Sequence, residues 1–99
     1  MLSQLRRYTI RTEDWDEFVA LVVDHVAPAR EALGFRVEGI WGDREDGTFV
    51  WIVSHDAPGG WEAAERAYYE SQERAGLPRE PRDFLLEVDT KVLEPIARQ

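Results

Sequence analysis

Six segments with strand-like or helix-like periodicity follow one another along this chain, and their order limits the folds open to it. Four segments alternate in polarity or are rich in β-branched and aromatic side chains, which predicts strands at residues 5–11, 35–41, 48–55 and 84–88, the last ending there or continuing toward Leu93. Two segments have apolar side chains at helical spacing or favour helix through alanine and glutamate, at residues 15–34 and 61–70. The predicted order is β-α-β-β-α-β.

Pro28 interrupts the first helical segment. Proline has no N–H to donate to the carbonyl of residue 24, so we expect a kink or break between Asp24 and Ala27. Gly34 provides a natural end for this long helix.

The β-α-β-β-α-β order is typical of the ferredoxin-like α+β sandwich, a four-stranded antiparallel sheet with both helices on one face and the first and third strands in the middle. The third strand contains Phe49-Val50-Trp51-Ile52-Val53, apolar at successive positions as expected of a strand buried on both faces. Two helices cover only one face. A second copy of the chain, packed sheet against sheet, is the simplest cover for the other face, and we therefore predict a homodimer.

Length and composition narrow the class of protein. Ninety-nine residues form one domain, and twenty acidic against twelve basic side chains give a net charge of −8, the wrong sign for binding nucleic acid or an anionic membrane. The absence of cysteine excludes disulfides, a thiol nucleophile and cysteine-ligated metals. The sequence has no long apolar run that would span a membrane, and residues 1–7 lack a signal-peptide pattern, so a cytoplasmic location is expected.

Three stretches carry a resemblance to a known family: Leu5-Arg6-Arg7-Tyr8, residues 34–41 and, most distinctively, residues 49–71. With them the chain resembles the NIPSNAP-like proteins of the dimeric α/β-barrel superfamily over nearly its whole length, as one domain at residues 1–99. The resemblance implies ferredoxin-like protomers whose sheets close a barrel, and a cavity open to a small, largely apolar molecule. Relatives in that superfamily include cofactor-independent monooxygenases, isomerases, haem enzymes and members without an established activity. The family offers no catalytic motif to carry over.

His55 is the first candidate for proton transfer, because histidine has an unperturbed pKa near neutrality. It lies between Ser54 and Asp56 at the end of the third strand, where a carboxylate could orient it as a general acid or base. In the alternative interpretation His55 makes a structural hydrogen bond to the turn after the strand. His25, on the first helix, is interpreted as a packing residue.

Charged residues inside predicted strands are the second group of candidates, since a buried charge is costly unless it is paired or used. Alternation along the second strand predicts two faces. In the predicted assignment Phe35, Val37 and Gly39 point toward the helices and Arg36, Glu38 and Ile40 toward the barrel interior, and a different strand register would exchange the two faces. Arg7 on the first strand faces the same interior. These charges either form ion pairs in the dimer interface or hold a polar group of a ligand, with Arg7 or Arg36 stabilising an enolate or phenolate.

Trp51 and Tyr68 are the aromatic residues interpreted as either pocket walls or core. Two histidines provide no convergent set of ligands, so neither a metal nor another cofactor is predicted. Two functions stay open. In the first, the chain is a homodimeric barrel protein that binds a small, largely apolar or aromatic molecule, and an oxygenase, isomerase or cyclase reaction without a cofactor could take place on it. In the second, the chain is a non-catalytic homodimer that binds a ligand or a protein. A haem enzyme with a histidine or tyrosine ligand is a more remote third.

Overall fold

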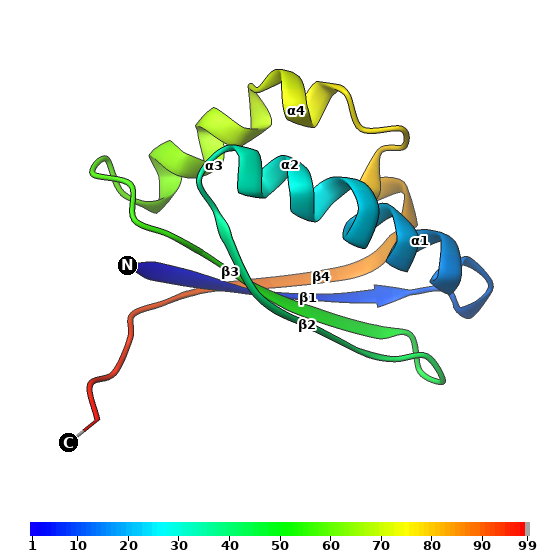
Figure 1. The fold of residues 1–99 in the computed structure, drawn as a ribbon. Helices are drawn as coiled ribbons and strands as arrows, with labels where there is room; N and C mark the ends of the chain where they lie inside the picture. Colours follow the sequence, from blue (N-terminus) through cyan, green and yellow to red (C-terminus); the bar gives the residue numbers. More distant parts are fainter. Residues whose placement is uncertain (99) are drawn as a thin grey trace.

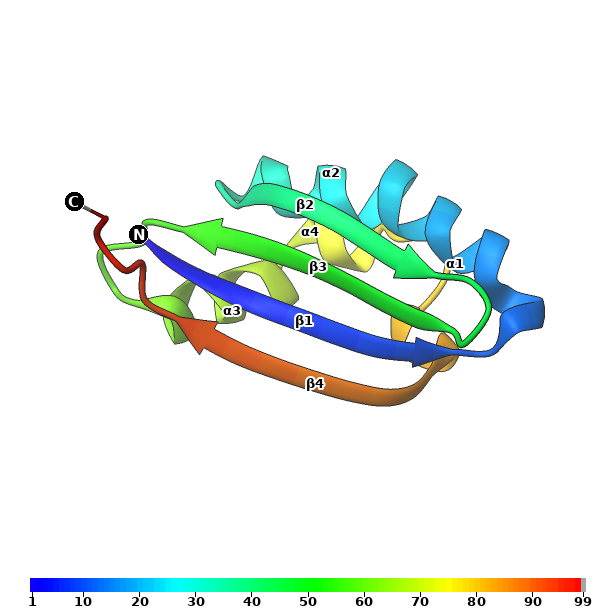
Figure 2. The same cartoon turned by 90° about the horizontal axis from the view of Figure 1, so that it is seen from below.

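The computed structural model describes residues 1–98, and one antiparallel sheet of four strands forms its centre. The strands are β1 (Leu2–Ile10), β2 (Arg36–Asp43), β3 (Thr48–His55) and β4 (Leu85–Leu93). They lie in the order β2-β3-β1-β4, with the helices on one face of the sheet (Figure 1, Figure 2). The predicted ferredoxin-like α+β architecture is confirmed, with β1 and β3 in the middle.

The helical segment after β1 changes type along its length. A 3₁₀ turn (Thr12–Asp14) leads into α1 (Trp15–Leu21), followed by a π-helical turn (Val22–Val26) and α2 (Ala27–Ala32). The N–H of Ala27 donates to the carbonyl of Val22, five residues back. Pro28 cannot donate to residue 24, so the preceding turn is wider than an α-helical turn. The irregularity expected near Asp24 is therefore a π-helical turn.

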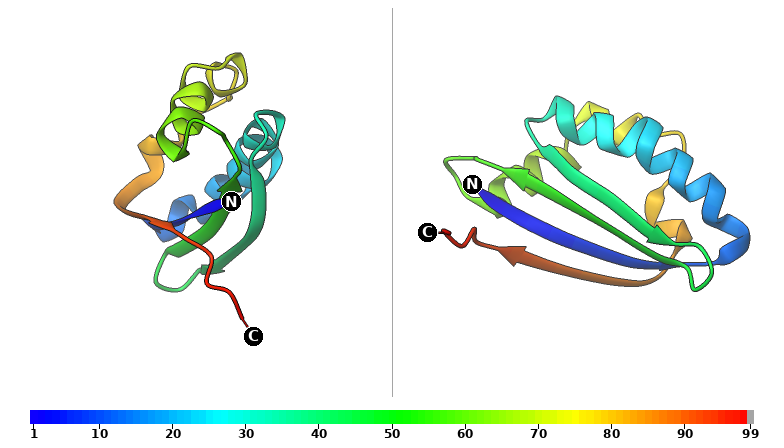
Figure 3. Two further views of the ribbon diagram at one scale, coloured as in Figure 1. Left: turned by 90° about the vertical axis from the view of Figure 1, so that its left-hand side faces the viewer. Right: turned by 60° about the horizontal axis from the view of Figure 1, so that its bottom comes forward.

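After β3, two further helices return the chain over the same face of the sheet: α3 (Trp61–Tyr69) and α4 (Gln72–Ala75). The Ser71 hydroxyl accepts a hydrogen bond from the Arg74 N–H at 3.1 Å and caps the start of α4. A 3₁₀ turn (Pro81–Phe84) then leads into β4 at the edge of the sheet (Figure 3). Each helix within residues 1–98 is too short or too polar to cross a lipid bilayer.

The hydrophobic core lies between the sheet and the helices. Phe49 and Trp51 of β3 face the helices, and each is 1% exposed. Phe18 on α1 meets Phe49 edge to face, with ring centroids 5.0 Å apart. Val50 and Ile52, the alternate residues of β3, point to the uncovered face and are only partly buried. The third strand is thus apolar on both faces.

A bulge at Glu38 decides which side chains of β2 reach the core. After Val37, β2 carries one more residue than β3 before pairing resumes. Ile40 consequently packs against the core, and Gly39 lies on the uncovered face beneath Trp41, whose ring would be 2.4 Å from a Cβ at that position. The prediction that Gly39 faces the helices and Ile40 the opposite side is wrong, because strand alternation breaks at the bulge.

Candidate functional site

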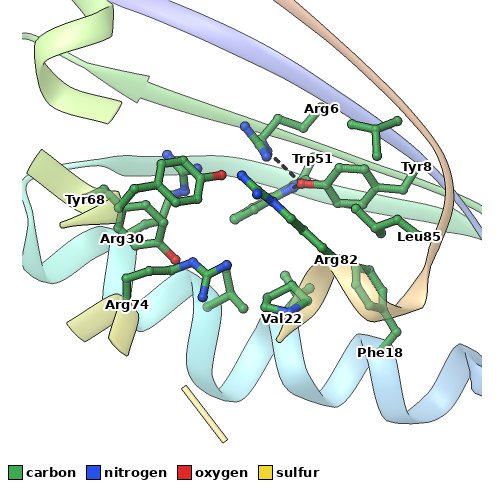
Figure 4. A pocket seen from close by; sticks show the side chains of 14 residues that line it. Arg6, Tyr8, Phe18, Val22, Arg30, Trp51, Tyr68, Arg74, Arg82 and Leu85 are labelled. Carbon is green, nitrogen blue, oxygen red and sulfur yellow. Dashed lines mark hydrogen bonds between the residues drawn. The ribbon is translucent and has the colours of Figure 1, made fainter. Parts of the chain in front are cut away.

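A cavity of about 300 Å³ lies between the sheet and the helices (Figure 4). β1, β3 and β4 form its floor, the helical segment from α1 to α2 forms one wall, and α3, α4 and the 3₁₀ turn before β4 form the other. Its lining combines aromatic and aliphatic side chains with four arginines: Arg6, Arg30, Arg74 and Arg82.

Local periodicity places the innermost of these side chains. Arg6 and Tyr8 are two residues apart on β1, so both lie on the helix-facing side of the sheet. Val22, Val26 and Arg30 follow one another at intervals of four residues and share one face of the helical segment. An arginine therefore occupies a position that continues an apolar stripe.

The Tyr8 hydroxyl is a hydrogen-bond acceptor on the cavity floor. The Arg6 Nε–H and the Trp51 Nε1–H both donate to it, at 2.7 and 3.0 Å. These bonds use oxygen lone pairs, so the phenol proton is left for a third group. Burial lowers the pKa of Arg6, but contacts with Tyr8, Tyr69 and Glu65 raise that pKa by more, which keeps the guanidinium charged.

Arg30 is a deeply buried charge, with an exposed fraction of 1%. Its guanidinium donates to the Glu65 carboxylate, and it lies 4.2 and 4.7 Å from the ring centroids of Tyr68 and Phe35. The second oxygen of Glu65 is 3.6 Å from Arg6. Ion pairing and cation–π contacts together offset the desolvation of Arg30, and one carboxylate serves two arginines.

The outer part of the cavity has a second group of charges around Glu80. Arg74 Nη2 is 2.8 Å from both carboxylate oxygens of Glu80, and this bond lowers the pKa of Glu80 and raises the pKa of Arg74. Arg82 Nε is 4.0 Å from Glu80, and 70% of the Arg82 side chain is exposed. Arg74 and Arg82 lie 5.5 and 5.4 Å from the ring centroid of Tyr69. Arg82 thus lies at the rim of the cavity.

Tyr68 places an unpaired hydroxyl in the cavity. The residue is 1% exposed, and its hydroxyl has no hydrogen-bond partner among residues 1–98. The hydroxyl points into the cavity, toward its arginine side chains (Figure 4). Burial raises the pKa of Tyr68, and the positive charges of Arg30 and Arg74 offset only part of that shift. The phenol is therefore neutral at pH 7 and able to donate.

The site residues proposed from the sequence divide between the two faces of the sheet. Trp51 and Tyr68 line the cavity. Arg7, Arg36 and Glu38 lie on the uncovered face, where Arg7 is 3.4 Å from Asp89 and Arg36 is 3.5 Å from Glu38. On the same face the Ser3 and Ser54 hydroxyls are hydrogen-bonded at 2.7 Å, and the Ser54 hydroxyl donates to the Glu38 carboxylate at 2.8 Å. The structure therefore separates the predicted aromatic wall from the predicted charged cradle.

His55 lies away from the main cavity, beside a second pocket of about 160 Å³. Its Nε2 is 3.0 Å from the carbonyl oxygen of Leu33, which makes that nitrogen the donor, and its ring packs edge to face on Phe35 at 4.5 Å. The remaining nitrogen, Nδ1, is buried without a partner among residues 1–98. His55 thus has a structural hydrogen bond, and its proposed catalytic role stays a prediction.

Sequence reasoning did not select the arginines and Tyr8 as site residues. Arg30 could have been found from the sequence, because it continues the apolar stripe of Val22 and Val26, and an arginine in such a position must be buried and paired with a carboxylate. Arg82 had no such signal, because it reaches the cavity from a 3₁₀ turn. Within residues 1–98, no three His, Cys, Asp or Glu side chains are arranged to hold a metal ion.

Solved structures share this arrangement of sheet and helices, although no family model matches the sequence and no curated protein is significantly similar to it. An uncharacterised NIPSNAP domain protein from Burkholderia xenovorans superposes with a TM-score of 0.79 at 19% identity, covering 98% of this chain and 96% of that one. A NIPSNAP family protein from Agrobacterium tumefaciens gives 0.80 at 12% identity, covering 96% and 92%. The chain shares the fold of these NIPSNAP proteins.

The same fold is found in a solved structure whose name states an enzymatic activity. A solved antibiotic biosynthesis monooxygenase superposes with a TM-score of 0.71 at 18% identity, covering 98% of this chain and 100% of the other. The resemblance drawn from the sequence is confirmed in the fold. At these identities the likeness concerns the backbone, so the function of this chain must be argued from its own side chains.

Proposed function

We propose that this NIPSNAP-like chain binds a small aromatic molecule in the cavity between its sheet and helices. The observation that carries the proposal is a cavity of about 300 Å³, a volume at the lower end for small-molecule sites, with Tyr8, Trp51 and Tyr68 in its walls. Flat aromatic surfaces favour a planar ligand. A small-molecule role is also consistent with the name of the antibiotic biosynthesis monooxygenase that shares the fold.

Calorimetric titration with 2-naphthamide, a neutral planar probe, tests this proposal. We expect saturable binding at one site, and Val88→Trp should weaken it by about tenfold or more by filling the cavity. Val88 lines the cavity and is 50% exposed, so the larger side chain disturbs the core little. Val92→Trp is the matched control, because Val92 lies on the same side of β4, is 42% exposed and is not part of the cavity lining. Equal affinities in both variants and the wild type would contradict binding in this cavity.

We also propose that the chain forms a homodimer through the uncovered face of the sheet. Support comes from Trp41, Val50 and Ile52, apolar side chains on that face that a sheet-on-sheet contact would bury. In sedimentation experiments we expect a dimer, and Ile52→Glu should produce monomers. Val23→Glu places the same charge at a half-exposed helix position and should leave the dimer intact. A monomeric wild-type chain would refute this part.

A second candidate function is a cofactor-independent oxygenase, isomerase or cyclase reaction on the bound molecule, with His55 and Arg36 in the roles inferred from the sequence. The monooxygenase that shares the fold favours it. The cavity favours binding alone, because its lining within residues 1–98 contains no histidine and no carboxylate to act as a base. Native mass spectrometry of gently purified protein would identify a retained molecule for turnover assays. Unchanged turnover of it in His55→Ala and Arg36→Ala would remove both roles.

A further inference from the structure

The cavity concentrates positive charge in a chain that is strongly acidic overall. Arg6, Arg30, Arg74 and Arg82 line it, whereas the whole chain has a net charge of −8. Guanidinium groups are costly to desolvate and are usually balanced by carboxylates nearby. The three largely buried guanidinium groups therefore need matching carboxylates, and the exposed Arg82 at the rim is open to a ligand of opposite charge.

Only two carboxylates within residues 1–98 form ion pairs with these arginines. Glu65 is bound to Arg30 and lies near Arg6, and Glu80 is bound to Arg74. Arg82 approaches Glu80 at 4.0 Å, the outer limit of an ion pair. The cavity thus has a surplus of positive charge, and Arg82 is the arginine with the weakest carboxylate contact.

The surplus charge lies close to an unused hydrogen-bond donor. The Tyr68 hydroxyl is buried, has no partner among residues 1–98 and points into the cavity that Arg82 also lines (Figure 4). A buried hydroxyl without a partner loses the hydrogen bonds that it would make with water. A ligand oxygen that accepts from Tyr68 would restore one of them.

We propose that the cavity selects an aromatic carboxylate, with its ring against the aromatic walls and its carboxylate between the Tyr68 hydroxyl and the Arg82 guanidinium. This inference rests on the proposed binding function and adds the charge of the ligand. A planar guanidinium matches a carboxylate with two parallel hydrogen bonds, which a neutral carbonyl or hydroxyl cannot reproduce. The acidic exterior of the chain repels anions, so selectivity for an anion must come from this site.

The test compares two ligands of the same shape, 2-naphthoate and 2-naphthamide, by calorimetric titration at pH 7. The wild type should bind the carboxylate about tenfold more tightly than the amide, as expected for a charge-assisted hydrogen bond. Arg82→Gln should remove this preference and leave the affinity for the amide unchanged. Because the Arg82 side chain is 70% exposed, the variant should keep its fold.

Two further variants separate a local site from general electrostatics. Arg66→Gln removes the same charge from an exposed position on α3 that is not part of the cavity lining, and the preference for the carboxylate should persist. Tyr68→Phe keeps the ring and removes only a hydroxyl without a partner among residues 1–98, so it should reduce the preference while the fold stays intact.

The possible failures are distinguishable. If neither ligand binds, the proposed function fails, and this inference fails with it. If both ligands bind with equal affinity, the proposed function stands and selection of a carboxylate is overturned. If Arg66→Gln weakens carboxylate binding as much as Arg82→Gln does, long-range charge explains the preference and the local site is refuted.

Discussion

Removing Glu65 should destabilise the fold strongly, because it leaves the buried Arg30 without its carboxylate. Loss of one partner of a buried ion pair typically costs about 3–5 kcal/mol. Arg30 is 1% exposed, but the rings of Tyr68 and Phe35 lie within 5 Å of its guanidinium and continue to stabilise the charge. Taking about 4 kcal/mol, the middle of that range, and an offset of roughly 0.5–2 kcal/mol from such contacts, we expect Glu65→Ala to cost about 2–3.5 kcal/mol.

Arg30→Met provides the contrast. Methionine keeps most of the length and packing of the arginine stem while it removes the charge. Glu65 then still has Arg6 at 3.6 Å, and 19% of the Glu65 side chain is exposed to water. The variant should therefore cost about 1 kcal/mol, as expected for a volume-conserving change in a core. The double variant should be no less stable than Glu65→Ala alone, since the charge of Arg30 that Glu65→Ala leaves unpaired is also removed.

Urea unfolding followed by tryptophan fluorescence measures these differences. With a urea m-value of about 1.5 kcal/mol per molar for a chain of this size, Glu65→Ala should lower the midpoint by about 1.3–2.3 M and Arg30→Met by less than about 1 M. If Arg30→Met were as destabilising as Glu65→Ala, the loss would come from packing, and the explanation based on an uncompensated charge would be wrong.

Three smaller effects follow from other contacts. The hydrogen bond from Arg74 holds the pKa of Glu80 below its usual 4.5, so Glu80→Gln should lower the unfolding free energy at neutral pH. The loss should be less than about 1 kcal/mol, because the pair is partly exposed. The difference between the variant and the wild type should disappear as the pH falls through the folded-state pKa of Glu80. Thermal unfolding of both proteins at several pH values measures this difference, and a difference that does not change with pH would contradict the prediction. In urea unfolding, Gly47→Ala should cost at least about 1 kcal/mol more than Gly60→Ala. Both glycines have positive φ, but a Cβ at residue 47 would lie 2.1 Å from the backbone oxygen of Ile10, whereas a Cβ at residue 60 meets nothing within 4 Å. Equal losses would refute the steric argument. Tyr8→Phe should cost about 1–3 kcal/mol in urea by leaving two nitrogen donors unpaired, and a neutral effect would show that water replaces the hydroxyl.

The order of elements could be predicted from periodicity because strands and helices repeat their apolar positions differently. Residues 48–55 and the stretch that ends before Gly34 each kept one pattern long enough to be recognised. Periodicity could not show where the alternation of side chains along a strand is interrupted. The bulge at Glu38 adds one residue without any change in composition, and it exchanges the faces of Gly39 and Ile40. Side-chain faces on β2 therefore required the three-dimensional pairing.

The site was less predictable than the fold, for a related reason. Trp51 and Tyr68 could be proposed as pocket walls because aromatic side chains supply flat surfaces for planar ligands as readily as they fill cores. Arg74 and Arg82 reach the cavity from α4 and from the 3₁₀ turn before β4, and no repeating pattern records the path of the chain between them. His55 was selected for its intrinsic pKa, whereas the cavity is lined by groups that keep one charge state.

The arginines of the cavity separate stability from recognition. Arg30 is enclosed and bound to Glu65, so its replacement changes the folding free energy together with any binding. Arg82 is largely exposed and weakly paired, so its replacement should change binding without changing the urea midpoint. If Arg82→Gln lost both carboxylate selectivity and stability, the charges around the cavity would form one coupled network, and the assignment of ligand selection to the rim would have to be abandoned.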